Sequence, residues 1–141
     1  RFTILMKKNI LLDMSATLIH HGHVRLIKKA SKFGNVIIAL TKDSEVKKYK
    51  GYTPEINFIH RKEILQSFKN VYKVVSCNFI ITDNFLKKLK IDLIVHGNDN
   101  LNKVSKRKIK IFKRTEGISS TLIRKKACAN LKKKSSKSIL Y

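Results

Sequence analysis

Short apolar runs alternate with helical patterns along the chain, and this alternation restricts the possible folds more than any other feature. A short, continuous apolar run is typical of a strand that is buried on both faces of a parallel sheet. Strand, helix and strand at this spacing indicate right-handed crossover units. The sequence therefore predicts an α/β fold in three layers with about five parallel strands. The predicted strands are Asn9–Met14, Val36–Leu40, Val71–Val75, Ile91–Val95 and Ile109–Phe112.

Helices are predicted between these strands from the spacing of apolar residues and from capping residues. The first ends at about Phe33, where Gly34-Asn35 predicts a left-handed cap. The last begins after Ser119, a favourable N-cap, and runs to about Leu131. The polar stretch 41–55 is predicted as a long, Lys-rich loop. The other predicted helices are His60–Phe68 and Thr82–Leu89, the second of which is capped by Thr82 or Asp83.

The chain of 141 residues is predicted to form a single domain, residues 1–141, that can bury a core. Residues 1–5 precede a Met-Lys-Lys start and are interpreted as an extension, and residues 132–141 as a basic, flexible tail. Cys77 and Cys128 are isolated, which predicts reduced, buried thiols and a cytoplasmic protein. Because no apolar run reaches the length of a membrane span, we expect no integral membrane association.

The formal net charge of +23 favours anionic partners without choosing among them. Most positive residues are lysines spread over the whole length as solvated helix faces. Aromatic residues make up 8% of the chain and are not interleaved with the basic clusters, as a base-stacking platform requires. We therefore expect no specific nucleic-acid binding. Residues 132–134 could touch anionic lipid, but the tail lacks an amphipathic apolar face, which favours a solvated end.

The stretch His20-His21-Gly22-His23 stands where the first strand gives way to a helix. The first N–H groups of a helix have no partner within it and the macrodipole is positive there, so that end favours an anion. Gly22 lets a ligand approach the backbone closely. His20 and His23 are therefore predicted to face one bound phosphate chain. Because no third ligand follows at a regular spacing, a metal ion held by these histidines is not expected.

Two further polar segments follow predicted strands, and open parallel sheets bind ligands at the carboxyl ends of their strands. The segment His96-Gly97-Asn98-Asp99-Asn100 follows the fourth strand. Arg114–Thr121 follows the fifth and leads into the last helix, whose N-terminus presents hydroxyls and free amides to an anion. The sequence therefore predicts that one edge of the sheet carries the functional residues.

Together these residues resemble the cytidylyltransferase family, in particular the small bacterial glycerol-3-phosphate cytidylyltransferases and the catalytic domain of choline-phosphate cytidylyltransferases. The similarity extends from Met6 to about Leu131. His20–His23 matches the His-x-Gly-His motif, and Arg114–Ser119 reads RTEGIS, the second and more specific signature. The other matches are Tyr49–Thr53 at the family's lysine loop, His60–Lys62 at its helix-starting arginine and Gly97–Asp99 at its Gly-Asp-Asp position.

The resemblance implies a Rossmann-like nucleotidyltransferase fold. It implies transfer of CMP from CTP to a phosphorylated alcohol such as glycerol-3-phosphate or phosphocholine, which gives a CDP-alcohol and pyrophosphate. Positioned positive charge would stabilise this in-line displacement. The resemblance also implies a homodimer, and Mg2+ bound through the triphosphate and not by protein side chains.

Roles for individual residues follow from the same resemblance. The implied catalytic residues are His20, His23, Lys50 and Arg114. Arg61, together with Lys50, would receive the phosphate of the second substrate. Implied nucleotide- or phosphate-binding residues are Ser15, Ala16, Gly22, Asn98, Asp99, Thr115, Gly117, Ile118, Ser119 and Thr121.

The chain departs from the family at two places. Met14–Thr17 replaces Gly-Thr-Phe-Asp, and Asn98 replaces the first acid of Gly-Asp-Asp. These changes alter the lining beside the phosphates and leave the alcohol phosphate open. A related adenylyltransferase is one alternative, although RTEGIS favours cytidine. A degenerate, non-catalytic nucleotide-binding module is another, which the changed segment supports and the intact histidine, lysine and arginine set opposes.

Overall fold

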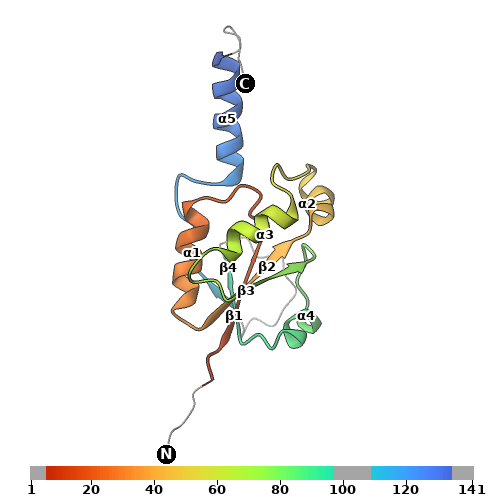
Figure 1. Ribbon diagram of the computed structural model, residues 1–141, viewed down its shortest axis with the longest axis vertical. Coiled ribbons are helices and arrows are strands. Elements are labelled where there is room, and N and C mark those ends of the chain that lie inside the picture. The colour runs from red at the N-terminus through yellow and green to blue at the C-terminus, as the bar shows by residue number, and fades with distance from the viewer. Residues whose placement is uncertain (1–5, 97–108, 135–141) are drawn as a thin grey trace, which may run out of the picture.

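The computed structural model describes residues 6–96 and 109–134. Its five strands form one sheet in the order β3-β2-β1-β4-β5, and every neighbouring pair is parallel (Figure 1). This architecture confirms the predicted α/β fold with five parallel strands. The strands are β1 (Asn9–Met14), β2 (Asn35–Thr41), β3 (Lys73–Cys77), β4 (Leu93–His96) and β5 (Ile109–Ile111).

Strand β1 lies at the centre of the sheet because it pairs with both β2 and β4. Leu12, for example, is in register with Ile38 on one side and Val95 on the other. The loop that follows β1 therefore leaves from the middle of the carboxyl edge. The connecting helices are α1 (His21–Ser31), α2 (Asp43–Lys50), α3 (Phe58–Gln66), α4 (Asp83–Lys88) and α5 (Ser120–Lys134).

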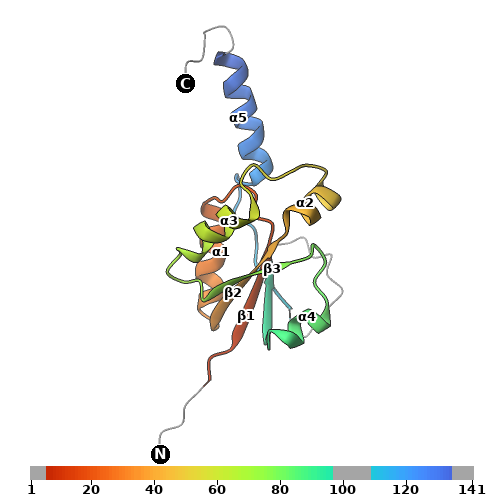
Figure 2. The ribbon, with the colours of Figure 1, turned by 45° about the vertical axis from the view of Figure 1, so that its right-hand side comes forward.

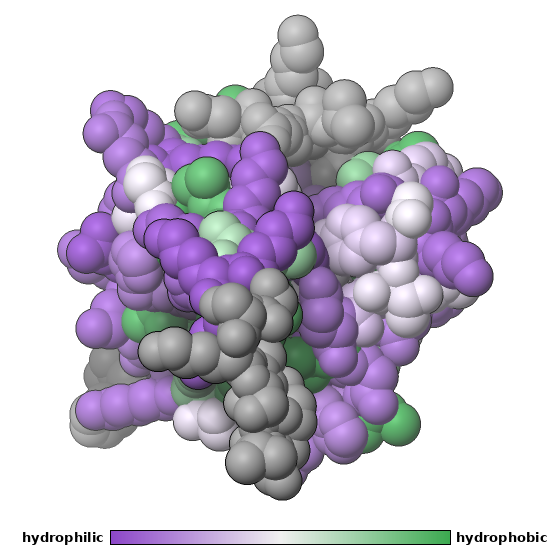
Figure 3. Space-filling view, turned by 90° about the horizontal axis from the view of Figure 1, so that it is seen from above, coloured by the Kyte–Doolittle hydropathy of each residue, from purple (hydrophilic) through white to green (hydrophobic). Residues whose placement is uncertain are grey.

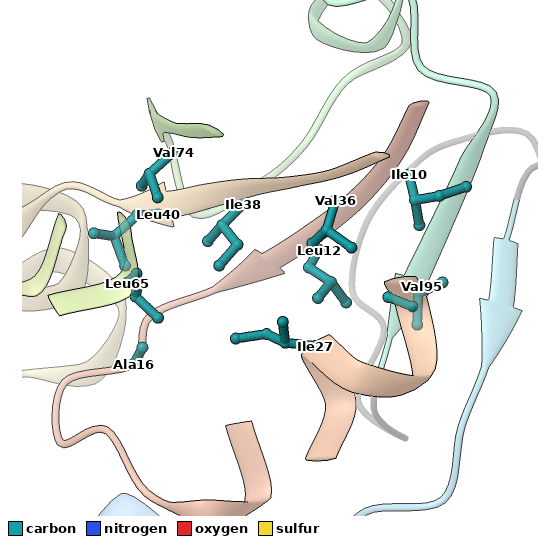
Figure 4. Packing of buried hydrophobic residues seen from close by; sticks show 11 residues of the cluster. Ile10, Leu12, Ala16, Ile27, Val36, Ile38, Leu40, Leu65, Val74 and Val95 are labelled. Atoms are coloured by element: carbon teal, nitrogen blue, oxygen red, sulfur yellow. The ribbon is translucent and has the colours of Figure 1, made fainter. Parts of the chain in front are cut away.

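Helices α1 and α3 cover one face of the sheet and α4 covers the other (Figures 1 and 2). Successive strand residues point to opposite faces, so β1 contributes to both cores. Leu12 packs in the cluster that contains Ile27 of α1 and Leu65 of α3 (Figure 4). Leu11 packs in the other cluster, with Leu86 of α4. Burial on both faces explains why the strands are continuous apolar runs.

The structure differs from the sequence-based prediction in one helix, α2, and at the end of another, α1. The stretch predicted as a long loop contains α2, whose single buried residue, Val46, gives no apolar periodicity. Helix α1 ends at Ser31, and its cap Lys32 has right-handed geometry, so the predicted left-handed cap at Gly34 is wrong. Gly34 is required for another reason: a Cβ there would lie 2.1 Å from the carbonyl oxygen of Lys8.

Helix α5 extends away from the rest of the domain (Figures 1 and 2). None of its residues is buried, and it continues to Lys134, beyond the predicted end at Leu131. Cys128 on this helix is exposed, so the prediction of two buried thiols holds only for Cys77. Among residues 6–96 and 109–134, no helix has the length and apolar character needed to cross a membrane.

The close approach at Gly34 predicts a large loss of stability in Gly34→Ala. The added Cβ meets backbone, which cannot move aside as a flexible side chain could, so the free energy of unfolding should fall by about 3 kcal/mol or more. Gly51→Ala is the control, because its Cβ would meet nothing within 4 Å and only its φ of 79° is unfavourable. That variant should lose about 1 kcal/mol. Urea denaturation measures both, and equal losses would contradict the argument.

Candidate nucleotide-binding site

A cleft of about 270 Å³ lies at the carboxyl end of the sheet, between the N-termini of α1 and α5. This end of the molecule is mostly hydrophilic when seen from above, with small apolar patches between polar side chains (Figure 3). The sequence-predicted residues that line the cleft are Ser15, Ala16, His20, Gly22, His23, Lys50, Arg114, Thr115, Ile118, Ser119 and Thr121. Segments that are distant in sequence therefore meet here.

The other four predicted residues have different outcomes. Asn98 and Asp99 lie outside the residues that the structure describes. Gly117 lies between two lining residues without lining the cleft itself. Arg61 is buried inside the protein.

The imidazoles of His20 and His23 hold the first turn of α1 through reciprocal hydrogen bonds. The backbone N–H of Gly22 donates to Nδ1 of His20 at 3.1 Å, and the backbone N–H of His20 donates to Nδ1 of His23 at 3.1 Å. An acceptor nitrogen carries no proton, so a neutral ring must carry its proton on Nε2. Each ring therefore keeps one N–H donor for a ligand. The two ring centroids are 4.0 Å apart.

The surroundings of these rings favour the neutral imidazole. Burial, followed by electrostatic interactions with His20, Lys50 and Arg114, lowers the pKa of His23 to about 3. Burial and then His21 lower the pKa of His20. Both shifts follow from the cost of placing positive charge in a partly buried, already cationic site. The rings are therefore hydrogen-bond donors here, and Lys50 and Arg114 carry the positive charge.

The N-terminus of α5 forms the opposite wall of the cleft. The Ser119 hydroxyl accepts from the backbone N–H of Leu122 at 3.0 Å, which confirms the predicted N-cap. Ser120 donates to the carbonyl oxygen of Leu18 at 3.0 Å, and so attaches the helix to the loop before His20. Two helix N-termini, each with a positive macrodipole end, thus border one cleft.

Arg61 organises the loops around the cleft from inside the protein. Its side chain is 0% exposed, and its guanidinium donates to the carbonyl oxygens of Ser15, Thr41 and Ile56 and to the carboxylate of Asp43. Four hydrogen bonds compensate the burial of this charge. The burial of Arg61 and these four bonds to protein groups contradict the expectation that it receives a substrate phosphate.

The structure also adds residues that the sequence did not single out. Asp13, at the end of β1, is the only carboxylate among the described lining residues, and its Oδ1 lies 2.7 Å from Nδ1 of His96 on β4. Arg25 and Lys29 extend the basic lining along α1. Arg25 and Lys29 are four residues apart, so they lie on one face of the predicted helix, one turn after His21-Gly22. This spacing could have predicted that both side chains extend the site.

Comparisons with known proteins agree with this architecture. An ethanolamine-phosphate cytidylyltransferase of Arabidopsis thaliana is 30% identical over 129 residues, which cover 79% of this chain but only 30% of that protein. A glycerol-3-phosphate cytidylyltransferase of Staphylococcus aureus is 30% identical over 115 residues, which cover 76% of this chain and 85% of that protein. A lipopolysaccharide core biosynthesis protein of Thermoplasma volcanium shares the fold, with a TM-score of 0.63, 18% identity and coverage of 77% of this chain and 96% of that one.

The parallel sheet, with helices on both faces and a cleft at its carboxyl edge, defines an open α/β domain of the kind that binds ligands at that edge. The model of the cytidylyltransferase-like family matches residues 15–126. The chain belongs to this family, and the Arabidopsis thaliana and Staphylococcus aureus relatives are named as cytidylyltransferases.

The lowered pKa of His23 predicts how stability depends on pH. Between about pH 6.5 and pH 3 the imidazole binds a proton in the unfolded chain but not in the folded one. The free energy of unfolding therefore decreases as the pH falls through this range. The loss is about 1.4 kcal/mol per pH unit, or roughly 2 kcal/mol from pH 6.5 to pH 5. His23→Asn should remove it and flatten the decline, as measured by urea denaturation at each pH. His21→Asn, which changes the exposed neighbour, is the matched control, and a decline in His23→Asn as steep as in this control would contradict the assignment.

Proposed function

We propose that this chain transfers CMP from CTP to a phosphorylated alcohol, and that it releases pyrophosphate. The observation that carries the proposal is the pair of neutral imidazole donors, His20 and His23, in the same cleft as Lys50 and Arg114. Family membership and the named activities of the relatives support cytidine as the nucleoside and a phosphorylated alcohol as the acceptor.

The reaction is an in-line displacement at the α-phosphorus. A phosphate oxygen of the acceptor forms a bond to the α-phosphorus, while the bond from that phosphorus to the bridging oxygen breaks and pyrophosphate leaves. Negative charge is redistributed over the phosphoryl oxygens, so catalysis needs positioned donors and positive charge and no covalent nucleophile.

Each group of the cleft has a role that fits its chemistry. The Nε2–H groups of His20 and His23 would donate to the α- and β-phosphates. Lys50 would bridge the attacking phosphate and the α-phosphate. Arg114 and the N-terminus of α5, with Ser119 and Thr121, would bind the β- and γ-phosphates.

Mg2+ belongs to the proposal as an ion carried by the triphosphate. Among the described residues, no group of three or more His, Cys, Asp or Glu side chains could chelate a metal ion. Mg2+ is commonly held by substrate phosphates and waters with few protein ligands. The bound ion would shield the charge of the triphosphate. A homodimer, which the resemblance implies, and a cytoplasmic location, which the isolated cysteines favour, complete the proposal.

Pyrophosphate release tests the function. Wild-type protein should release pyrophosphate from CTP with Mg2+ and one of glycerol-3-phosphate, phosphocholine or phosphoethanolamine, and far less from ATP. His23→Ala and Lys50→Ala should lower turnover by about 10²–10³-fold, because each removes a donor that stabilises the transition state. Both side chains lie outside the hydrophobic clusters, so both variants should stay folded. Circular-dichroism melts should be close to wild type for Lys50→Ala and lowered for His23→Ala by about 1 kcal/mol, the cost of a lost helix-capping bond.

Lys47→Ala is the matched control, since Lys47 lies one turn earlier on α2 and does not line the cleft. It should keep wild-type turnover. Release from ATP but not from CTP would assign the chain to the adenylyl branch. Binding of CTP without any turnover would favour the non-catalytic module. Near-normal turnover in both alanine variants would contradict the assigned roles.

A further inference from the structure

Arg124 of α5 joins three segments that surround the cleft. Its Nε and Nη2 donate to the two carboxylate oxygens of Glu55 at 2.5 and 2.6 Å. Nη2 also donates to the hydroxyl of Thr17 at 2.6 Å. The guanidinium carbon lies 4.3 Å from the centre of the Tyr52 ring, and the hydroxyls of Tyr52 and Thr17 are 3.2 Å apart. Arg124 thus contacts both the segment after β1 and the segment after α2.

This network differs from an ordinary surface ion pair. Isolated exposed pairs contribute little, because water screens them and side-chain entropy opposes them. Here the Glu55 side chain is 45% exposed, but the Arg124 side chain is only 21% exposed and Thr17 is buried. The bidentate pair with Glu55 and the Tyr52 ring, whose centre lies 4.3 Å from the guanidinium carbon, restrain the guanidinium. The hydrogen bond from Arg124 lowers the pKa of Glu55, and the same bond raises the pKa of Arg124, so both groups stay charged at neutral pH.

Lys50 lies close to this network but is not itself anchored by packing. It is an exposed residue at the end of α2, a helix of eight residues with one buried side chain. Gly51 follows with a left-handed φ of 79°, and nothing lies within 4 Å of the position of its absent Cβ. Tyr52 is therefore the first residue after Lys50 that contacts α5, through Arg124, and the segment after β1, through Thr17. The position of the lysine relative to α5 depends on that attachment.

Thr17 contributes a hydrogen bond to the network but no charge. It stands where the resembled motif has aspartate, and its neutral hydroxyl accepts from Arg124 without neutralising it. Glu55, which lies with Tyr52 in the segment between α2 and α3, supplies the carboxylate instead. The segment Met14–Thr17, which differs from the family motif, is thus accompanied by a guanidinium from α5 and an acid from the segment between α2 and α3.

We propose that Arg124 is a positioning residue for Lys50. By fixing Tyr52 and Glu55 against the first turns of α5, it holds the lysine-bearing segment where Lys50 faces the anion bound by His23 and by the N-terminus of α5. This inference rests on the proposed function, because Lys50 matters only if a phosphate chain is bound there. Arg124 does not line the cleft and acts only through the segment that it holds.

A double-mutant cycle between Arg124 and Lys50 tests the proposal. Arg124→Gln should lower kcat/KM for the productive substrate pair by about 10- to 100-fold, the cost of misplacing a catalytic group. In a Lys50→Ala background the same change should lower it little further, because the group being positioned is already absent. Glu55→Gln should act in the same direction with a smaller effect. Lys126→Gln, which removes one positive charge from the exposed face of α5, should match wild type.

Amide hydrogen exchange in residues 51–56 gives a readout that does not depend on turnover. Arg124→Gln should speed exchange there, whereas Lys126→Gln should not. If wild type shows no transfer while Arg124→Gln still frees this segment, the proposed function fails but the anchoring stands. Equal exchange in the two variants would overturn the proposal. In an active wild type, it would also be overturned if Arg124→Gln lowered kcat/KM by the same factor with and without Lys50, because a purely structural role predicts additive effects.

Discussion

The site depends on two hydrogen bonds in which backbone N–H groups of α1 and its cap donate to imidazoles. Each bond uses the Nδ1 acceptor of one histidine, so each neutral ring carries its proton on Nε2. Gly22 is required for this arrangement, because a Cβ there would lie 2.8 Å from the His20 ring. The same bonds cap the helix and prepare two donors for a ligand. A structural requirement of the helix end thus sets the chemistry of the cleft.

Positive charge in this protein is divided between scaffold and site. Arg61 uses its charge inside the protein, where it ties the ends of β1 and β2 to the start of α2 and to the segment before α3. Arg124 ties α5 to two other segments at the rim. Lys50 and Arg114 are exposed and line the cleft. Two buried or partly buried arginines therefore hold the segments that present the exposed cations.

The sequence predicted the strands well because burial on both faces leaves a continuous apolar run, as in Ile10–Leu12. It missed α2, because one buried residue, Val46, produces no period. It placed Arg61 correctly on a helix, but a charge pattern does not reveal whether an arginine faces solvent or the interior. The predicted meeting of His23 with Lys50 in one cleft did appear, since parallel strands bring their carboxyl ends to one edge.

The contacts of Arg124 could not be predicted from the sequence for a related reason. Its partners Glu55 and Thr17 lie 69 and 107 residues away along the chain, and no local spacing records such a pair. The same holds for Asp13 and His96, which meet only because β1 and β4 are neighbours in the sheet. Long-range polar contacts follow from strand order and loop paths, which hydrophobic patterns do not specify in detail.

The protonation of the two histidines tests the central claim most directly. Nitrogen-15 NMR of the imidazole side chains near neutral pH distinguishes the neutral ring protonated on Nε2, the neutral ring protonated on Nδ1 and the charged imidazolium. The structure predicts neutral rings with the proton on Nε2 for both His20 and His23, and a change in the Nε2 resonances when CTP is added. Imidazolium rings, or protons on Nδ1, in the free protein would contradict the account.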